Sequence, residues 1–417
     1  MQQLEAGWPK AVGEAARHGL PGAIVATILP QTEADEMALL IQLLVGVGNA
    51  VGHGPHFKVG RTTHHTNEFA TLVGDSAKSR KGTSWDDVES LLRPIDEVWA
   101  TTRVQSGLSS AEGLAYHVRD AGERMTSGRL VPDPGVTDKR LLVREAEFAA
   151  VLRVMARKES KLSPVIRNAW DGKPLQDLVK HNPVIATNAH VSIVAHVTAG
   201  ELRQTLPSLE AANGFGNRFL WVAVRRSKLL PDGGHIPAEA LEPLVKQLKD
   251  AVGFARTVGE VKRDEEATAL WHEVYPELSK GEDSLVGHMT ARAEAHVVRL
   301  SLIYALLDMS QVVRREHLEA ALAVWLYCEA SARCIFAGLA VSKVERMATQ
   351  INEALGEAGR LGLTRTEISG LFNRNATTPE IDAALDHLKQ RGLARIVPGT
   401  GGVGRPSERW AAVCGTV

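Results

Sequence analysis

The 417-residue sequence has little cysteine, few aromatic residues and no long apolar run. Its three cysteines show no paired metal-binding spacing and are too few for a disulfide framework, which fits a reducing compartment. The longest apolar run, residues 37–51, contains Gln42 and Asn49 and is too short to span a bilayer. A basic start followed by an apolar core and a cleavage site is also lacking, so we expect a cytoplasmic protein with no membrane partner.

An excess of either charge is lacking as well, because 48 Lys+Arg stand against 49 Asp+Glu. This balance excludes a protein coated in positive charge, but it leaves room for a local nucleic-acid groove. With 44% hydrophobic and 23% charged residues the composition is that of a globular protein, and the length predicts two or three domains.

Changes in sequence pattern divide the chain into four predicted regions. Residues 1–54 are expected to form a helical collar, and residues 55–232 alternate short apolar strands with polar helices, which predicts an α/β domain with a largely parallel sheet. Residues 233–340 are predicted to form a helical lid, and residues 341–417 to form three helices followed by two strands, the order of a winged helix. The strands predicted in the α/β domain are 68–73, 97–101, 140–143 and 191–197. The elements predicted for the last region are helices 344–355, 364–372 and 378–392 and strands 393–397 and 407–411.

The segment between the strand at 68–73 and a helix predicted to begin near Trp85 is rich in small and basic residues. Such a loop aims backbone N–H groups and a helix N-terminus at an anion, which outlines a phosphate site for ATP with Mg²⁺. The loop residues are Gly74, Asp75, Ser76, Ala77, Lys78, Ser79, Arg80, Lys81, Gly82, Thr83 and Ser84.

The spacing of this loop departs from GxxxxGK[ST], since Arg80 stands six residues after Gly74 and Lys81 one further. We favour Lys81 as the phosphate-binding lysine and Thr83 or Ser84 as the hydroxyl on Mg²⁺. Arg80 remains the alternative to Lys81 as the phosphate-binding residue. Without a nucleotide, the same residues would form a basic surface turn.

Nucleotide hydrolysis also needs carboxylates at strand ends, to hold the metal ion and to polarise water. The apolar strand at 140–143 is followed by Glu145 and Glu147, an arrangement similar to a Walker B element, in which Glu145 is the predicted metal ligand. Glu112, after the predicted second strand, is a further candidate for the catalytic base. Taken singly, each acid also fits a solvated helix start.

Two further side chains are predicted to act on the γ-phosphate. His196 lies at the end of the strand 191–197 and is a candidate sensor, or else a histidine satisfied by the backbone. Arg218 lies on a glycine-containing loop before an apolar strand and is a candidate arginine finger for a neighbouring subunit, or else an arginine packed on an aromatic ring.

Taken together, these motifs resemble a family of helicase-like P-loop ATPases carried by phages, plasmids and integrated elements, often linked to primase-polymerases. The resemblance rests on segments 21–25, 74–84, 107–113, 147–148, 213–219 and 325–333. It implies a P-loop NTPase core of the AAA+ or RecA type and a replicative ATPase. A weaker likeness, over residues 290–325, is to the lid of minichromosome-maintenance helicases, and it implies that Arg292 is a second nucleotide sensor.

Basic residues in two places are candidates for DNA contact. Lys173 and Lys180 flank a predicted channel hairpin, and Lys389, Arg391, Arg405 and Arg409 lie in the recognition helix and wing of the predicted winged helix. Because residues 341–417 hold ten Lys+Arg against eight Asp+Glu, docking to a protein is nearly as good a reading of that region.

The sequence therefore predicts an ATP-dependent replicative DNA helicase that forms a ring, with a homo-hexamer, single-stranded or forked DNA and a primase or polymerase as expected partners. The alternatives are a helicase loader or initiator ATPase that does not unwind DNA, and a non-hydrolysing DNA-binding adaptor. A zinc site at His53, His56, His64 and His65 is not favoured, because these residues lack nearby cysteines and a helical spacing.

Overall fold

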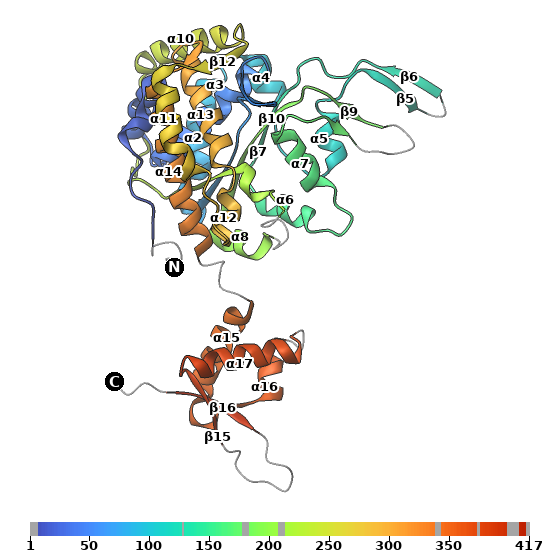
Figure 1. Cartoon of the computed structure of the whole chain (residues 1–417), viewed down its shortest axis with the longest axis vertical. Coiled ribbons are helices and arrows are strands. Elements are labelled where there is room, and N and C mark those ends of the chain that lie inside the picture. The colour runs from blue at the N-terminus through green and yellow to red at the C-terminus, as the bar shows by residue number, and fades with distance from the viewer. Residues whose placement is uncertain are drawn as a thin grey trace. The chain divides into compact units, whose positions relative to one another are not determined.

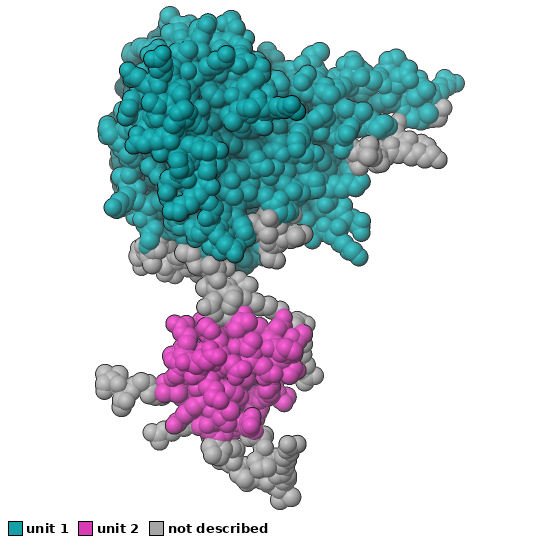
Figure 2. Space-filling view, in the orientation of Figure 1, with its two compact units in different colours: residues 1–336 teal, residues 337–417 magenta. Residues whose placement is uncertain are grey.

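The computed structural model describes residues 7–126, 129–176, 183–206, 213–337, 343–372, 376–397 and 408–413. The chain forms two compact units, residues 1–336 and residues 337–417, which are coloured separately in Figure 2. In the described part of the chain, no helix combines the length and the apolar composition that crossing a bilayer requires.

A five-stranded parallel sheet lies at the centre of the first unit, in the order β11-β3-β10-β7-β4. Its strands are β3 (Phe69–Gly74), β4 (Val104–Gln105), β7 (Arg140–Glu145), β10 (His190–Thr198) and β11 (Phe219–Ala223). The chain leaves β3 toward one side of the sheet and later reaches β11 on the other side, so the connections change direction at β3. The predicted α/β class with a parallel sheet is confirmed.

Helices cover both faces of this sheet (Figure 1). One side carries α2 (Glu36–Val51) and α3 (Lys81–Leu92), and the other carries α6 (Phe148–Met155), α7 (Leu162–Trp170) and α8 (Ala199–Thr205). Asp35 caps α2, and its residues from Met37 to Val51 are buried because the helix lies between the sheet and further helices.

The predicted collar is therefore a layer of the same unit and not a separate body. Before α2 the chain forms η1 (Glu14–Arg17), α1 (Gly19–Ile28) and η2 (Leu29–Gln31), and α1 contacts α2 and the helices of the predicted lid. Those later helices are α10 (Ala238–Ala255), α11 (Glu265–Leu278), α12 (Leu285–Thr290), α13 (Ala293–Leu307) and α14 (Arg315–Ala337). One hydrophobic core joins α1, α2, α10, α13 and α14.

The predicted lid also contributes strands that sequence reasoning missed. β12 (Glu260–Arg263) and β13 (Val312–Val313) join β1 (His56–Val59) and β2 (Thr62–His65) in a second sheet, β13-β12-β1-β2. Two hairpins complete the unit: β5 (Gly122–Thr126) with β6 (Arg129–Asp133), which extends away from the body in Figure 1, and β8 (Leu175–Gln176) with β9 (Ile185–Ala186).

Two local predictions in this unit are wrong. Residues 97–101 form helix α4 (Glu97–Thr102), which is capped by Asp96, and the strand begins only at Val104. A short apolar run fits a helix as well as a strand, and here burial of Trp99 against Asn49 of α2 decides for the helix. The helix predicted near Trp85 begins four residues earlier, at Lys81.

The second unit has the predicted order of three helices followed by two strands. Its helices are α15 (Lys343–Ala358), α16 (Arg365–Leu371) and α17 (Thr378–Gln390), with the short η5 (Gly359–Leu361) after α15. Its strands are β14 (Leu363–Thr364), β15 (Ala394–Val397) and β16 (Arg409–Ala412), which form the sheet β14-β16-β15. β14 was not predicted, because two residues carry no readable alternation. The core contains Ile351, Leu355, Ile368 and Leu385.

Candidate nucleotide-binding site

The loop from β3 to α3 has the geometry of an anion cradle. It passes through η3 (Ala77–Ser79), and Arg80, in the left-handed conformation with φ 59°, turns the chain into α3 at Lys81. No side chain caps α3, so the N–H groups of its first residues lack intrahelical acceptors. A Cβ atom on Gly74 would lie 2.2 Å from Ser79 Oγ, so the close return of the loop requires glycine there.

Lys81 points into this loop. Its Nζ donates to Ser79 Oγ at 2.9 Å and to the Ser76 carbonyl at 3.2 Å. Burial lowers the pKa of Lys81 to about 8, opposed by the charges of Glu201, Glu147 and Asp75, so the ammonium is still largely protonated at pH 7. A buried cation held by neutral oxygens suits a site that receives an anion.

Arg80, the alternative phosphate residue, points elsewhere. Its side chain is about 40% exposed, and Nε lies 2.5 Å from Glu33 Oε2. Arg80 is therefore engaged by Glu33 outside the loop, and the preference for Lys81 stays a prediction.

A cavity of about 640 Å³ opens beside Lys81 at the carboxyl ends of β3, β7 and β10. The register pairs Thr198 with Gly74, so the loops that follow β3 and β10 start at the same level. Ligands of open parallel sheets bind at this edge, where the connections change direction. The cavity is lined by Asp75, Ser76, Lys81, Gly82, Arg144, Ala146, Glu147, His196, Val197, Thr198 and Glu201.

The three predicted carboxylates have different surroundings. Glu147 is exposed, precedes α6 and lines the cavity. Glu145 is buried, and its Oε1 accepts hydrogen bonds from the N–H groups of Gly107 (2.7 Å) and Leu108 (2.6 Å). The carboxylate therefore holds the loop after β4, and Glu145 is not among the cavity residues, so its role as a metal ligand stays a prediction. Glu112 lies in the first turn of α5 (Ala111–Tyr116) and is not among the cavity residues.

The two predicted hydroxyl ligands, Thr83 and Ser84, are not among the residues that line the cavity. Ser84 is fully buried, and its Oγ donates to the Lys81 carbonyl at 2.7 Å and accepts from Gln42 Nε2 at 2.8 Å. These two bonds hold the hydroxyl against α2, and Ser84 is not among the residues that line the cavity. Thr83 is exposed on α3 and does not line the cavity.

His196 lines the cavity but does not fit the predicted sensor role. Its Nε2 is 2.9 Å from Gln42 Oε1, which can only accept, so the ring carries its proton there. Burial, with Arg144 and Lys81 nearby, lowers the pKa of His196 to about 3, so the ring is neutral and its single N–H is already used. Arg144, which sequence reasoning missed, has an Nε without a hydrogen-bond partner among the described residues.

Glu201 was missed as well, although its signal was readable. Thr198 and Glu201 form a capping box at the start of α8, the pattern of Thr followed three residues later by Glu. Gln42 interrupts the apolar run of α2 because it bridges Ser84 and His196, a role that needs the fold to become visible.

The two predicted arginines lie at the opposite, amino edge of the sheet. Arg218 precedes β11, whose Phe219 pairs with Phe69, whereas Lys81 follows Gly74; β3 alone separates these levels by about 16 Å. Neither Arg218 nor Arg292 lines the cavity of its own chain.

At that edge the structure brings Arg218 and Arg292 together on one carboxylate. Asp171 accepts from Arg218 Nε at 3.2 Å and NH2 at 2.8 Å, and Arg292 NH1 lies 3.6 Å from Asp171 Oδ1. Both guanidinium groups also approach the ring of Trp170. Arg218 is 6% exposed.

Buried charges that the sequence did not single out complete this amino-edge cluster. Arg299 stacks on Trp170 at 3.6 Å and donates to the carbonyls of Asn67 and Trp170. Glu68 accepts from Trp170 Nε1 at 3.4 Å, and its Oε2 lies 2.9 Å from His296 Nδ1. Burial lowers the pKa of Arg299 to about 10.

The candidate DNA-contacting residues are divided between the two units. Lys173 is exposed and lies 3.8 Å from Asp171, at the base of the hairpin β8–β9. Lys180 and Arg405 lie outside the described residues. In the second unit Lys389 and Arg391 are exposed, but Arg409 donates to the carbonyls of Leu361 and Gly362.

The predicted recognition helix α17 also carries three acidic residues against one lysine. These are Glu380, Asp382 and Asp386, against Lys389. Glu380 forms a capping box with Thr377 and Asp382 pairs with Arg365, so this composition does not separate DNA binding from protein docking.

Two histidine groups were tested as metal sites. His53 and His65 stack with ring centroids 3.7 Å apart, and burial lowers the pKa of His65 to about 3 and of His64 to about 4. In the described part of the chain, the one group with three ligand atoms within 4.8 Å of one another is His18, Asp308 and His317.

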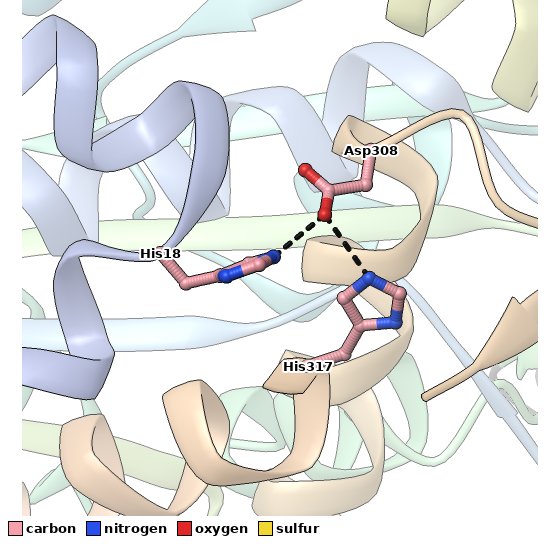
Figure 3. Close-up of side chains that lie close together, drawn as sticks. All are labelled: His18, Asp308 and His317. Atoms are coloured by element: carbon pink, nitrogen blue, oxygen red, sulfur yellow. Dashed lines mark hydrogen bonds and ion pairs between the residues drawn. The ribbon is translucent and has the colours of Figure 1, made fainter. Parts of the chain in front are cut away.

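Figure 3 shows Asp308 between the two rings, at 2.6 Å from His18 Nε2 and 3.2 Å from His317 Nε2. The His317 Nδ1 accepts the N–H of Arg314 at 3.0 Å, so its proton is on Nε2 and the lone pair that a metal needs is absent there. This group is a hydrogen-bonded clamp between the start of α1 and the α13–α14 corner.

In comparisons with known proteins, no family model and no curated protein matches the sequence.

Proposed function

We propose that the chain is an ATP-dependent replicative DNA helicase of a mobile genetic element, that is, an ATPase whose own hydrolysis drives DNA unwinding. The observation that carries the ATPase part is the position of Lys81: a buried ammonium at the start of α3, facing a cavity with exposed carboxylates at the carboxyl edge of a parallel sheet. Phosphates bind at such helix N-termini because free N–H groups and the helix dipole attract negative charge.

In this proposal Lys81 and the N–H groups of α3 hold the β- and γ-phosphates, and Arg144 supplies a second positive charge from β7. Glu147 accepts a proton from the attacking water, because it is exposed to the cavity and its side chain does not cap α6. His196 and Gln42 act behind this layer, as positioning residues between α2, α3 and β10.

Mg²⁺ fits the donor set of the cavity through Asp75 and Glu147, since hard oxygen ligands and phosphates are what this ion prefers. When bound, it would neutralise charge that develops on the phosphates.

The trans roles of Arg218 and Arg292 need a neighbouring subunit, because both lie at the far edge from their own Lys81. A ring, with a hexamer as the working hypothesis, brings the amino edge of one subunit to the cavity of the next. Mixing Lys81→Met with Arg218→Lys chains should restore part of the activity that each lacks alone, since some interfaces then hold both intact residues. A mixture as inactive as its components would contradict this arrangement.

The helicase part rests on the resemblance of the motifs and on the hairpin β8–β9, whose base at Asp171 holds Arg218. In this proposal the ring translocates on single-stranded or forked DNA, the second unit is a winged helix, and a primase or polymerase is its partner. The rival is a loader or initiator ATPase: a strand-displacement assay separates them, because the loader hydrolyses ATP and unwinds nothing.

ATP turnover by the purified chain tests the ATPase proposal directly. Lys81→Ala should abolish turnover, whereas Arg80→Ala, whose partner is Glu33, should retain most of it. No turnover in the wild-type chain, or no loss in Lys81→Ala, would leave the non-hydrolysing adaptor as the better function.

A further inference from the structure

A second cavity, of about 320 Å³, adjoins the carboxyl end of β3 on its β11 side. The N–H of Val224 donates to the Val73 carbonyl at 2.9 Å, so Arg225 follows directly at the level where the phosphate loop begins. The cavity is lined by Trp8, Pro9, Lys10, Ala11, Val12, Leu29, Asp35, Glu36, Met37, Arg225, Arg226, Ser227, Lys228 and Tyr327. We refer to it as the Trp8 pocket.

The Trp8 pocket and the phosphate loop share a carboxylate. Glu33 Oε2 lies 2.5 Å from Arg80 Nε, in the residue before Lys81, and 3.8 Å from Nε of Arg226, which lines the pocket. Thr32 also donates to Asp87 of α3 at 2.7 Å. One short segment, residues 32–36, therefore fixes the pocket relative to the helix that begins at Lys81.

The walls of the pocket have the chemistry of a base-stacking site. The Arg225 guanidinium carbon lies 4.8 Å from the centre of the Trp8 ring, and Tyr327 is buried with its hydroxyl donating to the Ala223 carbonyl at 2.8 Å. Aromatic rings and planar guanidinium groups are the surfaces on which nucleobases stack. Trp8 is half-buried and Arg225 is exposed, so both planes border solvent.

The polar group at the pocket floor also suits a base. Asp35 Oδ1 accepts from the N–H of Met37 at 2.9 Å and Oδ2 from the N–H of Arg225 at 3.1 Å. Each carboxylate oxygen has two acceptor positions, so each keeps one for an exocyclic amino group or ring N–H. Burial raises the pKa of Asp35, and the two backbone donors oppose that rise.

We propose that the Trp8 pocket binds the purine base of the nucleoside triphosphate whose phosphates lie at Lys81. This inference rests on the proposed ATPase function and adds a recognition element for the base, since His196 is the one aromatic side chain among the described residues that line the Lys81 cavity. The nucleotide then lies across the carboxyl end of β3, with its phosphates on the β10 side and its base on the β11 side.

Calorimetry with two ligands tests the proposal on the full chain: MgATP, and Mg-tripolyphosphate, which has the phosphates without the base. Trp8→Ala should weaken MgATP binding on the order of tenfold, the effect of losing one stacking partner, and leave tripolyphosphate binding unchanged. Trp8→Phe keeps an aromatic face and should retain most of the ATP affinity. Arg225→Ala, a surface change, should act as Trp8→Ala does and covers the case in which Trp8→Ala fails to fold.

Equal losses for both ligands, or no loss for either, would overturn the base pocket while leaving the ATPase intact. The wild-type chain should also bind MgATP more tightly than MgCTP, because two fused rings cover the indole better than one; equal affinities would contradict a purine site. Absence of binding by both MgATP and tripolyphosphate in the wild-type chain would overturn the proposed function itself, and the inference with it.

Discussion

The two edges of the central sheet carry charged residues in different surroundings. At the carboxyl edge, Lys81, Arg144 and Glu147 face a cavity, and Arg144 Nε has no hydrogen-bond partner within the described ranges. At the amino edge, Arg218 and Arg299 are buried and donate to protein oxygens, although Arg299 Nε has no hydrogen-bond partner within the same ranges. The two edges belong to the same strands, so the contrast comes from what each edge is packed against.

This difference separates a charge that faces a cavity of its own chain from a charge that is paired within the fold. A buried charge without a partner lowers the stability of the fold and is retained where it serves binding. Removing the partner of a paired buried charge, in contrast, costs a large part of the stability of the fold. The same mutation type should therefore change stability in opposite directions at the two edges.

The largest stability effect is expected from Asp171→Ala at the amino edge. It leaves Arg218 and Arg292 without their shared carboxylate and should lower the free energy of unfolding by about 3–5 kcal/mol, measured by urea denaturation of the full chain. Asp250→Ala removes the partner of Lys246 in an exposed pair and is the matched control, expected to change stability by less than about 1 kcal/mol. Equal effects would remove the contrast between the edges.

The opposite sign is expected from Lys81→Met at the carboxyl edge. Folding lowers the pKa of Lys81 from 10.5 to about 8, so the charged form is disfavoured in the folded chain; removing it should raise stability at pH 7 by up to about 3 kcal/mol while nucleotide binding is lost. The free energy of unfolding of the wild type should rise between pH 8 and 10.5, because the folded lysine has lost its proton in this range and the unfolded one has not. Lys81→Met should show no such rise. Lys78→Met, an exposed position in the same loop, is the control. A destabilised Lys81→Met chain would show that the lysine holds the fold.

Within the carboxyl edge, Glu145→Ala and Glu147→Ala should separate a structural carboxylate from a functional one. Glu145→Ala leaves two N–H groups without their acceptor and should cost about 2 kcal/mol of stability. Glu147→Ala should stay within about 0.5 kcal/mol of the wild type and should lose ATP hydrolysis with binding retained. Thermal melting and turnover of both variants decide this, and an exchange of the two outcomes would reverse the assignment.

The smallest effect concerns His64, beside the amino-edge arginines. Burial, and then Arg299, Arg292 and Arg263, lower its pKa to about 4, so the neutral ring is favoured; the stability it contributes is present above pH 6.5 and is lost as pH falls toward 4. The stability difference between the wild type and His64→Gln should therefore shift by about 1 kcal/mol between pH 7.5 and 5.5, against the wild type. Urea denaturation at several pH values measures it, and a difference that does not vary with pH would contradict the assignment.

Much of the first unit could be predicted because long, continuously apolar strands leave a strong pattern. The strands at 68–73, 140–143 and 191–197 were found close to their observed bounds, as was the order of elements in the second unit. The helix at 97–102 was predicted as a strand because a run of five residues is too short to distinguish the helical from the strand period. Strands β12, β13 and β14 were missed because each has only two to four residues.

For the site, sequence reasoning led to Lys81 and Glu147 but could not separate them from Ser84 and Glu145. By residue type and spacing, all four are suitable for a nucleotide site. They differ in the partner that each side chain contacts in the folded chain. Ser84 meets Gln42, and Glu145 meets the N–H groups of Gly107 and Leu108, from segments 37 to 42 residues away.

By itself, the sequence determined the parallel sheet, the basic loop after its first strand and the three-helix order of the second unit, since local periodicity and loop composition encode these. Only the tertiary structure decided which charges face a cavity and which are paired, that Arg218 and Arg292 share Asp171, and that Glu33 links Arg226 of the Trp8 pocket to Arg80. The physical reason is that hydrogen bonding and desolvation depend on neighbours in space, and in a parallel sheet those neighbours come from distant parts of the chain.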